Sequence, residues 1–304
     1  MTMKVSSTSS TKIDGILLLN KSQGMTSNYA LQKAKRLLSA KKAGHTGSLD
    51  PLATGMLPVC FGEATKICQF LLEADKCYQT TGLLGIKTNT ADATGEEIAR
   101  VDMFTISSQQ LIEVLEKHKG VIKQVPSMFS ALKHQGTPLY CFARKGIDIE
   151  RPAREILISE LELNAFDGVQ FSLTVTCSKG TYIRNLVEDI GDVLGVGAHV
   201  THLHRVYTAG LNDMPMYSLD ELEAMSLSER KACLIPIDRA VDYLEQVTLL
   251  DDEVITIRQG RAITNKINVE LADCVRLYDA RAQFIGLGER STNGTIKAKR
   301  LLSF

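Results

Sequence analysis

The stretch GHTGSLDPLATGMLPVCFGEATK, residues 44–66, contains the features around which the rest of the chain is organised. Its glycines open backbone angles that other residues avoid and let a ligand approach the main chain. Pro51 restricts Asp50 to extended or turn geometry, so this carboxylate does not continue a helix. With His45 nearby and no second acid between residues 44 and 55, Asp50 is a candidate nucleophile or base. The alternative is an Asp-Pro turn in which the Asp50 side chain bonds its own backbone.

The first part of this stretch, GHTGSLDPLATG at 44–55, resembles the active-site motif of bacterial tRNA pseudouridine-55 synthases, the TruB family. The resemblance implies that Asp50 is the catalytic nucleophile and that His45 fills the space left by a flipped nucleotide. It also implies an α+β fold of the pseudouridine-synthase type. That fold has a mixed, mainly antiparallel central sheet flanked by helices, followed by a small C-terminal β-barrel (PUA-like) domain.

Composition is typical of a globular protein with a large core: 304 residues, 44% hydrophobic and 23% charged, with a formal net charge of zero. A nucleic-acid partner therefore requires a local concentration of basic residues. We expect a disordered tail at 1–12, a catalytic domain at 13–246 and a PUA-like RNA-binding domain at 247–304.

Cysteine usage and hydropathy indicate the compartment. Seven cysteines without a Cys-x-x-Cys pair argue against a disulfide framework and a thiolate zinc site, and favour reduced thiols in the cytoplasm. No apolar run approaches the roughly 20 residues needed to cross a membrane, and no long apolar region marks a signal peptide. We expect a cytoplasmic protein without a membrane partner.

The N-terminal segment predicts a strand followed by a helix. Gly15–Leu19 is a short apolar run typical of a buried strand. Lys21 follows it as a surface lysine or a phosphate ligand, and the family resemblance implies that it supports the active site. Ser27 or Asn28 is expected to cap a helix that runs to Ser39. The basic face of that helix is either solvated or bound to RNA phosphates.

Residues 75–84 read as a strand with Tyr78 near its start. A tyrosine in a strand is commonly a packing residue. Lys76-x-Tyr78 and the following GIKTNTADATG at 85–95 again resemble the synthase family, which implies that Tyr78 lies against the target base. The face of a phenol stacks on uracil and its hydroxyl can exchange a proton.

A helix is predicted over Ser107–Lys119, with Ser107 and Gln110 as a capping box. The following region, about 121–154, is rich in turns and basic residues with interleaved aromatics. We expect an RNA-contacting insertion there, the alternative being a solvated loop with a small hydrophobic anchor. Its segment PSMFSALK at 126–133 resembles the part of the family that grips the tRNA arm.

Gln170–Cys177 alternates apolar and polar residues and predicts a half-buried strand. Helical spacing begins near Ile183 and places Arg184 at the start of a helix. A surface arginine is the ordinary interpretation. The motif CSKGTYIR at 177–184, however, resembles the synthase motif whose arginine pairs with the catalytic aspartate. The resemblance implies that Arg184 orients Asp50 and that Tyr182 contributes to the uridine pocket.

His199, His202 and His204 invite a metal interpretation, but on a strand residues three apart face opposite sides. We therefore expect no metal. The segment HVTHLHR at 199–205 resembles the family's closing pocket segment, which implies that Leu203 packs against the bound nucleoside. The family usually has arginine where His204 stands, so a phosphate contact there is open, with Arg205 as the alternative cation for it.

The C-terminal region changes to short apolar runs, separated by turn residues. Strands are predicted at 254–257, 275–278, 284–287 and 296–298, forming a small β-barrel. The RQGR at 258–261 and FIGLG at 284–288 are similar to the PUA RNA-binding domain.

The functional hypothesis is an isomerase that converts the uridine at tRNA position 55 to pseudouridine by base flipping and an aspartate nucleophile. Neither a phosphate-cradling Gly-x4-Gly-Lys-Ser/Thr loop nor a dinucleotide fingerprint occurs, and the isomerisation implied by the resemblance needs no cofactor. The expected partner is the T-arm stem-loop of tRNA, with the protein acting as a monomer. Two alternatives remain: an RNA-binding protein without this chemistry, and a hydrolase that uses Asp50 on another substrate.

Overall fold

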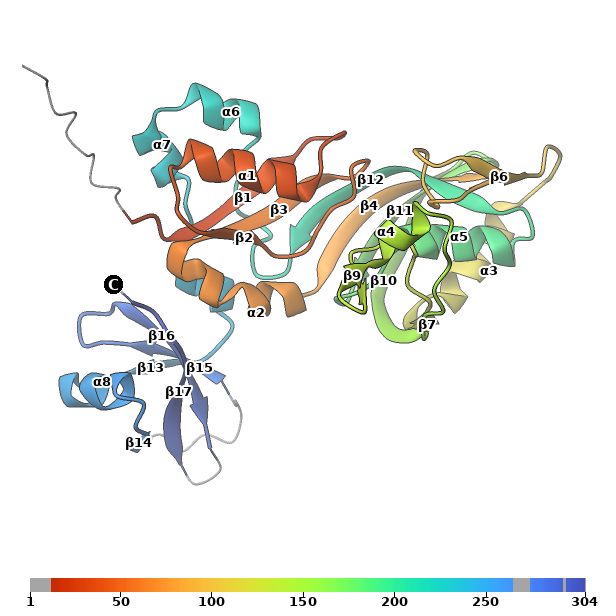
Figure 1. Cartoon of the computed structure of the whole chain (residues 1–304). Coiled ribbons are helices and arrows are strands. Elements are labelled where there is room, and N and C mark those ends of the chain that lie inside the picture. Colours follow the sequence, from red (N-terminus) through yellow and green to blue (C-terminus); the bar gives the residue numbers. More distant parts are fainter. Residues whose placement is uncertain (1–11, 265–273, 292–293, 304) are drawn as a thin grey trace, which may run out of the picture.

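The computed structural model describes residues 12–264, 274–291 and 294–303 (Figure 1). Apart from Lys12, the predicted N-terminal tail lies outside the described residues. Among the described residues, no helix combines the length and the apolar character that crossing a bilayer demands. All seven cysteines are free thiols.

A large central sheet forms the body of the molecule. In the described chain its strands run in the order β1-β3-β12-β4-β11-β10-β7, with β2 beside β3. Among the described strands of this sheet only β12 and β3 pair in parallel, so the predicted mixed, mainly antiparallel sheet is confirmed. The strands are β1 (Gly15–Lys21), β2 (Ala43–His45), β3 (Thr54–Phe61), β4 (Lys76–Leu84), β7 (Gly120–Gln124), β10 (Arg154–Phe166), β11 (Gln170–Cys177) and β12 (Ala198–Thr208).

The strand pattern follows from where each face is buried. On β11 the apolar residues of the alternating sequence are all buried, as predicted. On β1 both faces are buried because each meets a different apolar cluster. Leu17 and Leu19 belong to the main core, whereas Ile16 and Leu18 belong to a second cluster shared with the C-terminal region.

Helices cover the sheet at both ends (Figure 1). Those of the described chain are α1 (Ser27–Leu37), η1 (Gly62–Lys66), α2 (Cys68–Glu73), α3 (Ser108–Lys117), α4 (Leu139–Ala143), α5 (Ile183–Val193), α6 (Leu219–Ala224), α7 (Leu227–Ala232), η2 (Ile237–Val241) and α8 (Asp251–Arg258). The capping box of Ser107 and Gln110 is present at α3, one residue before the helix begins.

The predicted cap of the first helix was wrong by one residue. Thr26 caps α1, its hydroxyl accepting a hydrogen bond from the Tyr29 amide. Ser27 is buried instead, and its hydroxyl both donates to the Leu49 carbonyl at 2.9 Å and accepts from the Leu49 amide at 2.7 Å. The Ser27 hydroxyl therefore makes long-range bonds to the Asp50 loop, and Thr26 provides the local cap of α1. The helix ends at Leu37, before the predicted Ser39.

The C-terminal region forms a curled sheet in the order β13-β15-β16-β17-β14, consistent with the predicted small barrel. Its strands are β13 (Gln246–Thr248), β14 (Ile263–Thr264), β15 (Cys274–Tyr278), β16 (Phe284–Arg290) and β17 (Thr295–Leu301). The strands predicted at 275–278, 284–287 and 296–298 are confirmed.

The strand predicted at 254–257 is wrong, because these residues lie in α8. Acidic residues occupy the first turn, where they favour a helix, and the Glu253 carboxylate accepts from the Leu250 amide. Val254 and Ile257, three residues apart, both pack in the C-terminal core, while Ile255 remains exposed. The spacing is helical although the residues themselves favour strands.

The two sheets are joined by the second apolar cluster and by polar bonds around it. Tyr278 and Phe284 of the C-terminal sheet pack in the same cluster as Ile16 and Cys60 of the central sheet. The Tyr278 hydroxyl donates to Asp238 Oδ2 at 2.7 Å. Figure 1 shows the C-terminal sheet as a lobe beside α2.

Two glycines with almost the same backbone angle test how closely β3 approaches β12. Gly55 has φ +96° and a Cβ there would lie 2.3 Å from the Arg205 carbonyl oxygen, whereas Gly168 has φ +97° and open space. We expect Gly55→Ala to lower the free energy of unfolding by about 3 kcal/mol, combining strain with overpacking. Gly168→Ala should lower it by only about 1 kcal/mol. Urea unfolding measures both, and equal losses would show that β3 has room beside β12.

Candidate active site

The Asp50 loop, residues 46–53, connects β2 to β3 and is fastened to neighbouring segments through its backbone. Ser27 makes the two bonds to Leu49 described above. The Gly24 amide donates to the Pro51 carbonyl at 2.8 Å, and the Ala53 amide donates to the Asp50 carbonyl at 3.1 Å. The backbone that carries Asp50 is therefore fixed by α1 and by the turn before it, as well as by the loop itself.

The predicted pairing of Asp50 with Arg184 is present. Arg184 Nε lies 2.8 Å from Asp50 Oδ2; the arginine side chain is 4% exposed and the aspartate side chain 38% exposed. Nε is the guanidinium nitrogen that lies closest to the Asp50 carboxylate. Arg184 Nη1 donates to the Thr90 carbonyl at 2.7 Å, and Nη2 donates to the Phe129 carbonyl at 2.9 Å. The guanidinium thus joins three segments and leaves Asp50 partly open.

Asp92 is a site residue that the sequence analysis did not identify. It is buried, and its Oδ2 lies 3.7 Å from Arg184 Nη1. Its Oδ1 accepts from the Thr94 amide at 2.9 Å and the Thr90 hydroxyl at 2.9 Å. An aspartate among threonines resembles an ordinary turn in sequence. Only the fold shows that this turn faces Arg184.

Opposing effects act on the ionisation of Asp50. Burial, with the neighbouring Asp92 carboxylate, raises the pKa of Asp50, while the Arg184 guanidinium and the Lys21 ammonium lower it. Arg184 thus counteracts a rise that would otherwise favour the neutral, unreactive acid.

Lys21 is a buried residue rather than a surface lysine. Its ammonium donates to the carbonyls of Ser22 at 3.0 Å and Met25 at 2.9 Å, near the start of α1. Burial lowers the pKa of Lys21 to about 8, and Asp50 opposes that change. Its contacts fix the chain that leads into α1 and leave it near the Asp50 carboxylate.

The remaining predicted residues lie on the elements that surround the loop. Tyr78, on β4, is half-buried, and burial raises the pKa of its hydroxyl; Asp50 adds to the rise. Tyr182 precedes α5, and its backbone N–H donates to Gln124 Oε1 at 2.8 Å. Asp50 also raises the pKa of Tyr182, after burial. The Asp50 carboxylate therefore raises the pKa of both phenols.

Leu203 lies in the core, whereas His45 is partly exposed. Leu203 is buried in the main core on β12, against which Tyr78 also packs. His45 is half-buried on β2, and burial lowers the pKa of its imidazole, which favours the neutral form.

His199 and His204 have separate hydrogen-bond partners. His204 Nδ1 lies 2.8 Å from the Thr54 hydroxyl, and His199 Nδ1 lies 2.9 Å from the Ile86 carbonyl. Within the described ranges, no three His, Cys, Asp or Glu side chains gather as metal ligands do.

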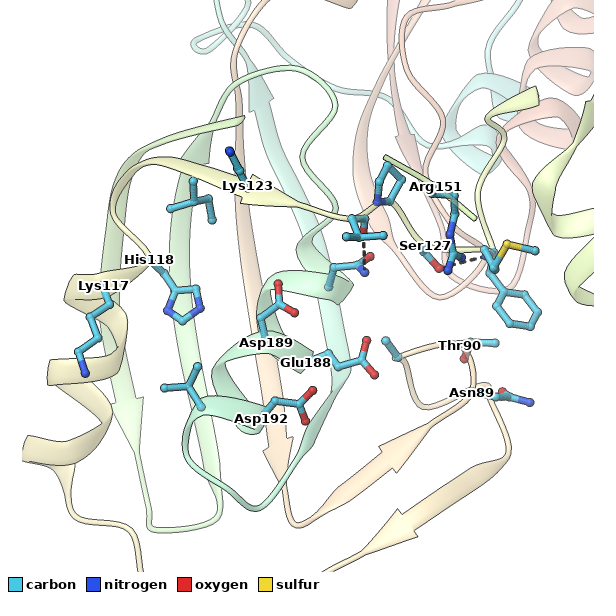
Figure 2. A pocket seen from close by; sticks show the side chains of 18 residues that line it. Asn89, Thr90, Lys117, His118, Lys123, Ser127, Arg151, Glu188, Asp189 and Asp192 are labelled. Atoms are coloured by element: carbon cyan, nitrogen blue, oxygen red, sulfur yellow. Dashed lines mark hydrogen bonds between the residues drawn. The ribbon is translucent and has the colours of Figure 1, made fainter. Parts of the chain in front are cut away.

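A separate cavity of about 680 Å³ lies between α3, α5 and the segment 125–129. Figure 2 shows Glu188, Asp189 and Asp192 projecting from α5 toward it. Lys87 pairs with Asp192 at 2.7 Å and with Glu188 at 3.5 Å. Asp50 does not line this cavity, but Thr90 and Phe129, whose carbonyls accept from Arg184, do.

Comparison with known proteins identifies the family. Residues 35–183 match "TruB family pseudouridylate synthase (N terminal domain)", residues 184–242 match "tRNA pseudouridylate synthase B C-terminal domain", and residues 246–302 match "Pseudouridine synthase II TruB, C-terminal". The chain is 66% identical over 292 residues to tRNA pseudouridine synthase B of Legionella pneumophila (strain Philadelphia 1), covering 96% of each chain. It is 47% identical to the protein of that name from Methylobacillus flagellatus, covering 95% of each chain.

A solved structure of an H/ACA RNP bound to a substrate RNA containing 2′-deoxyuridine has a chain with the same fold. Its TM-score is 0.71 at 22% identity, covering 95% of this chain and 85% of that chain. The sequence matches extend over both sheets and include the Asp50 loop and Arg184. The chain belongs to the TruB family of pseudouridylate synthases.

Proposed function

We propose that this chain is a cytoplasmic enzyme that converts the uridine at position 55 in the T loop of tRNA to pseudouridine. The observation that carries the proposal is the Asp50 carboxylate, 38% exposed and held 2.8 Å from a buried arginine. This arrangement presents one ionised oxygen to a ligand while its partner is fixed by the fold. It suits a single nucleophile better than an acid pair.

The chemistry assigns a role to each group around Asp50. The N1–C1′ bond breaks, uracil turns, and C5 bonds to C1′; the proton lost from C5 is balanced by a proton gained at N1. Asp50 acts as the nucleophile and Arg184 keeps it ionised and oriented. Tyr78 lies against the base and exchanges a proton with it, while Tyr182 and Leu203 complete the uridine pocket. No redox or phosphate cofactor is needed for this isomerisation.

Access to the uridine requires it to leave the stack of the T loop. Extrusion costs a few kcal/mol, and an aromatic group in the vacated space offsets part of that cost. We assign this role to the neutral imidazole of His45. Lys21 supports the site by fixing the segment before α1. Because Asp50, Tyr78 and Arg184 come from one chain, we propose that the enzyme acts as a monomer.

RNA binding is assigned to two regions. The insertion at about 121–154 carries exposed Lys133, Arg144 and Lys145, and the Arg144 guanidinium lies 5.4 Å from the centre of the Tyr140 ring. These groups suit phosphates and unstacked bases. We further propose that residues 13–246 form the catalytic domain and residues 247–304 a PUA-like domain that contacts the tRNA.

Asp50→Asn is expected to leave T-arm binding intact and to yield no pseudouridine above background, because the amide cannot act as a carboxylate nucleophile. The measurement is pseudouridine in a T-arm transcript incubated with wild type or variant. Release of free uracil by wild type would favour a hydrolase. Tight binding without product from wild type would favour an RNA-binding protein.

Arg184→Gln is expected to move the acid limb of the kcat/KM profile to higher pH. Arg184 lowers the pKa of Asp50, so its removal raises that pKa, and the reactive carboxylate then forms only at higher pH. Arg151→Gln is the matched control, because Arg151 pairs with Asp148 at 3.3 Å and not with Asp50. An acid limb that stays in place in Arg184→Gln contradicts the role assigned to Arg184.

The insertion is tested by salt dependence. Lys133→Ala/Lys145→Ala should reduce the slope of log K against log salt by about 2, because each phosphate contact contributes roughly one unit. The control removes two cations that pair with their own neighbours, Arg100 with Glu97 and Lys119 with Glu116. We expect Arg100→Ala/Lys119→Ala to keep the wild-type slope. Identical slopes for the two double variants would place the phosphate contacts elsewhere.

A further inference from the structure

Arg205 lies where three strands of the candidate site meet. On β12 it is the parallel partner of Gly55 in β3 and the antiparallel partner of Tyr78 in β4. Directly opposed residues on neighbouring strands present their side chains to the same face of a sheet. Arg205 is therefore adjacent to the start of β3, where the Asp50 loop ends, and to Tyr78. It is 1% exposed.

The Arg205 guanidinium contacts both ends of the Asp50 loop. Its Nε donates to the Met56 carbonyl at 2.6 Å, after the loop, and its Nη2 donates to the Gly47 carbonyl at 3.1 Å, before Asp50. Gly47 has φ +105°, and a Cβ there would lie 3.5 Å from Nη1. One rigid, planar group thus fixes the separation of the two loop ends.

The charge of Arg205 lacks an acidic partner within 4 Å among the described residues. Its neighbours Lys21 and Lys76 are themselves cations, and Arg205 lowers the pKa of both. A buried, uncompensated charge is destabilising, and a neutral side chain would fill this position at lower cost. Packing alone therefore does not account for an arginine here.

The charge of Arg205 acts on the ionisation of the Tyr78 hydroxyl. Burial raises the pKa of the Tyr78 hydroxyl, while the charge and hydrogen bonding of Arg205 lower it. Without that charge, the phenol in its apolar setting would release its proton less readily. The same side chain that fixes the loop also favours negative charge on the Tyr78 oxygen.

We propose that Arg205 is a positioning residue for the isomerisation, which fixes both ends of the Asp50 loop and directs its positive charge toward Tyr78. This inference rests on the proposed function. Arg205 has two separable actions: the two carbonyl contacts need the planar guanidinium, whereas the electrostatic effect needs only a positive charge.

Arg205→Lys and Arg205→Met test these actions. Both should lower kcat at least tenfold, while KM for the T-arm transcript changes less than about threefold, since a displaced loop misplaces the reacting oxygen. A buried lysine here would lose its charge near pH 8, as Lys21 and Lys76 do, so Gly47→Ala is the variant that keeps the charge and should leave the alkaline limb of the kcat profile in place. In Arg205→Met the limb should move to higher pH, because the pKa of Tyr78 rises. Any alkaline limb that remains in Tyr78→Phe comes from another group, and replacing Arg205 in that background should not move it.

Gly47→Ala gives a second readout that retains the buried charge. It strains one end of the loop at φ +105°, and we expect a lower kcat with an unchanged alkaline limb. Wild-type kcat in folded Arg205→Lys or in Gly47→Ala would overturn the inference, as would a loss confined to KM. Wild-type enzyme that forms no pseudouridine would instead overturn the proposed function, so the two failures are distinguishable.

Discussion

The ion pair between Asp50 and Arg184 is the interaction on which the rest of the site depends. An arginine cannot lose its proton inside a protein, so a 4% exposed guanidinium is destabilising unless nearby groups compensate its charge. Two carbonyls and two carboxylates, Asp50 and Asp92, provide that compensation. The segments around residues 50, 90 and 129 are therefore held together by one side chain, and each must keep its place for the pair to form.

The central sheet brings these segments together because of its one parallel pairing. β12 lies between β3 and β4, so the end of the Asp50 loop and Tyr78 become neighbours across a single strand. Arg205 occupies that strand and contacts both loop ends. The site thus has a guanidinium on either side of the loop: Arg184 contacts the carboxylate, and Arg205 contacts the backbone. The first lowers the pKa of Asp50, and we propose that the second fixes the backbone that carries it.

Local patterns predicted the elements whose causes are local. The alternation at Gln170–Cys177 and the capping box at Ser107 involve only near neighbours, and both appear as predicted. The pairing of Asp50 with Arg184 was implied by family resemblance and is present in the fold. Local sequence patterns gave a wrong prediction where contacts between residues far apart in the chain determine the structure. Ser27 bonds Leu49 rather than capping its own helix.

The residues that sequence reasoning missed share one property: their partners are remote in the chain. Asp92 resembles a turn residue until the fold places Arg184 beside it, and Arg205 resembles a basic residue of a strand until Gly47 and Met56 approach it. The error at α8 has a different origin. Its β-branched residues favour a strand, but the acidic first turn and the packing of Val254 and Ile257 favour a helix.

The most direct test of the account is the structure of the full chain bound to a T-arm stem-loop. We expect that structure to show an extruded uridine with its ring against Tyr78 and its ribose at Asp50, while Arg184 still contacts the Asp50 carboxylate. A uridine bound instead in the cavity between α3 and α5, or an Asp50 turned away from Arg184 in the complex, would contradict it.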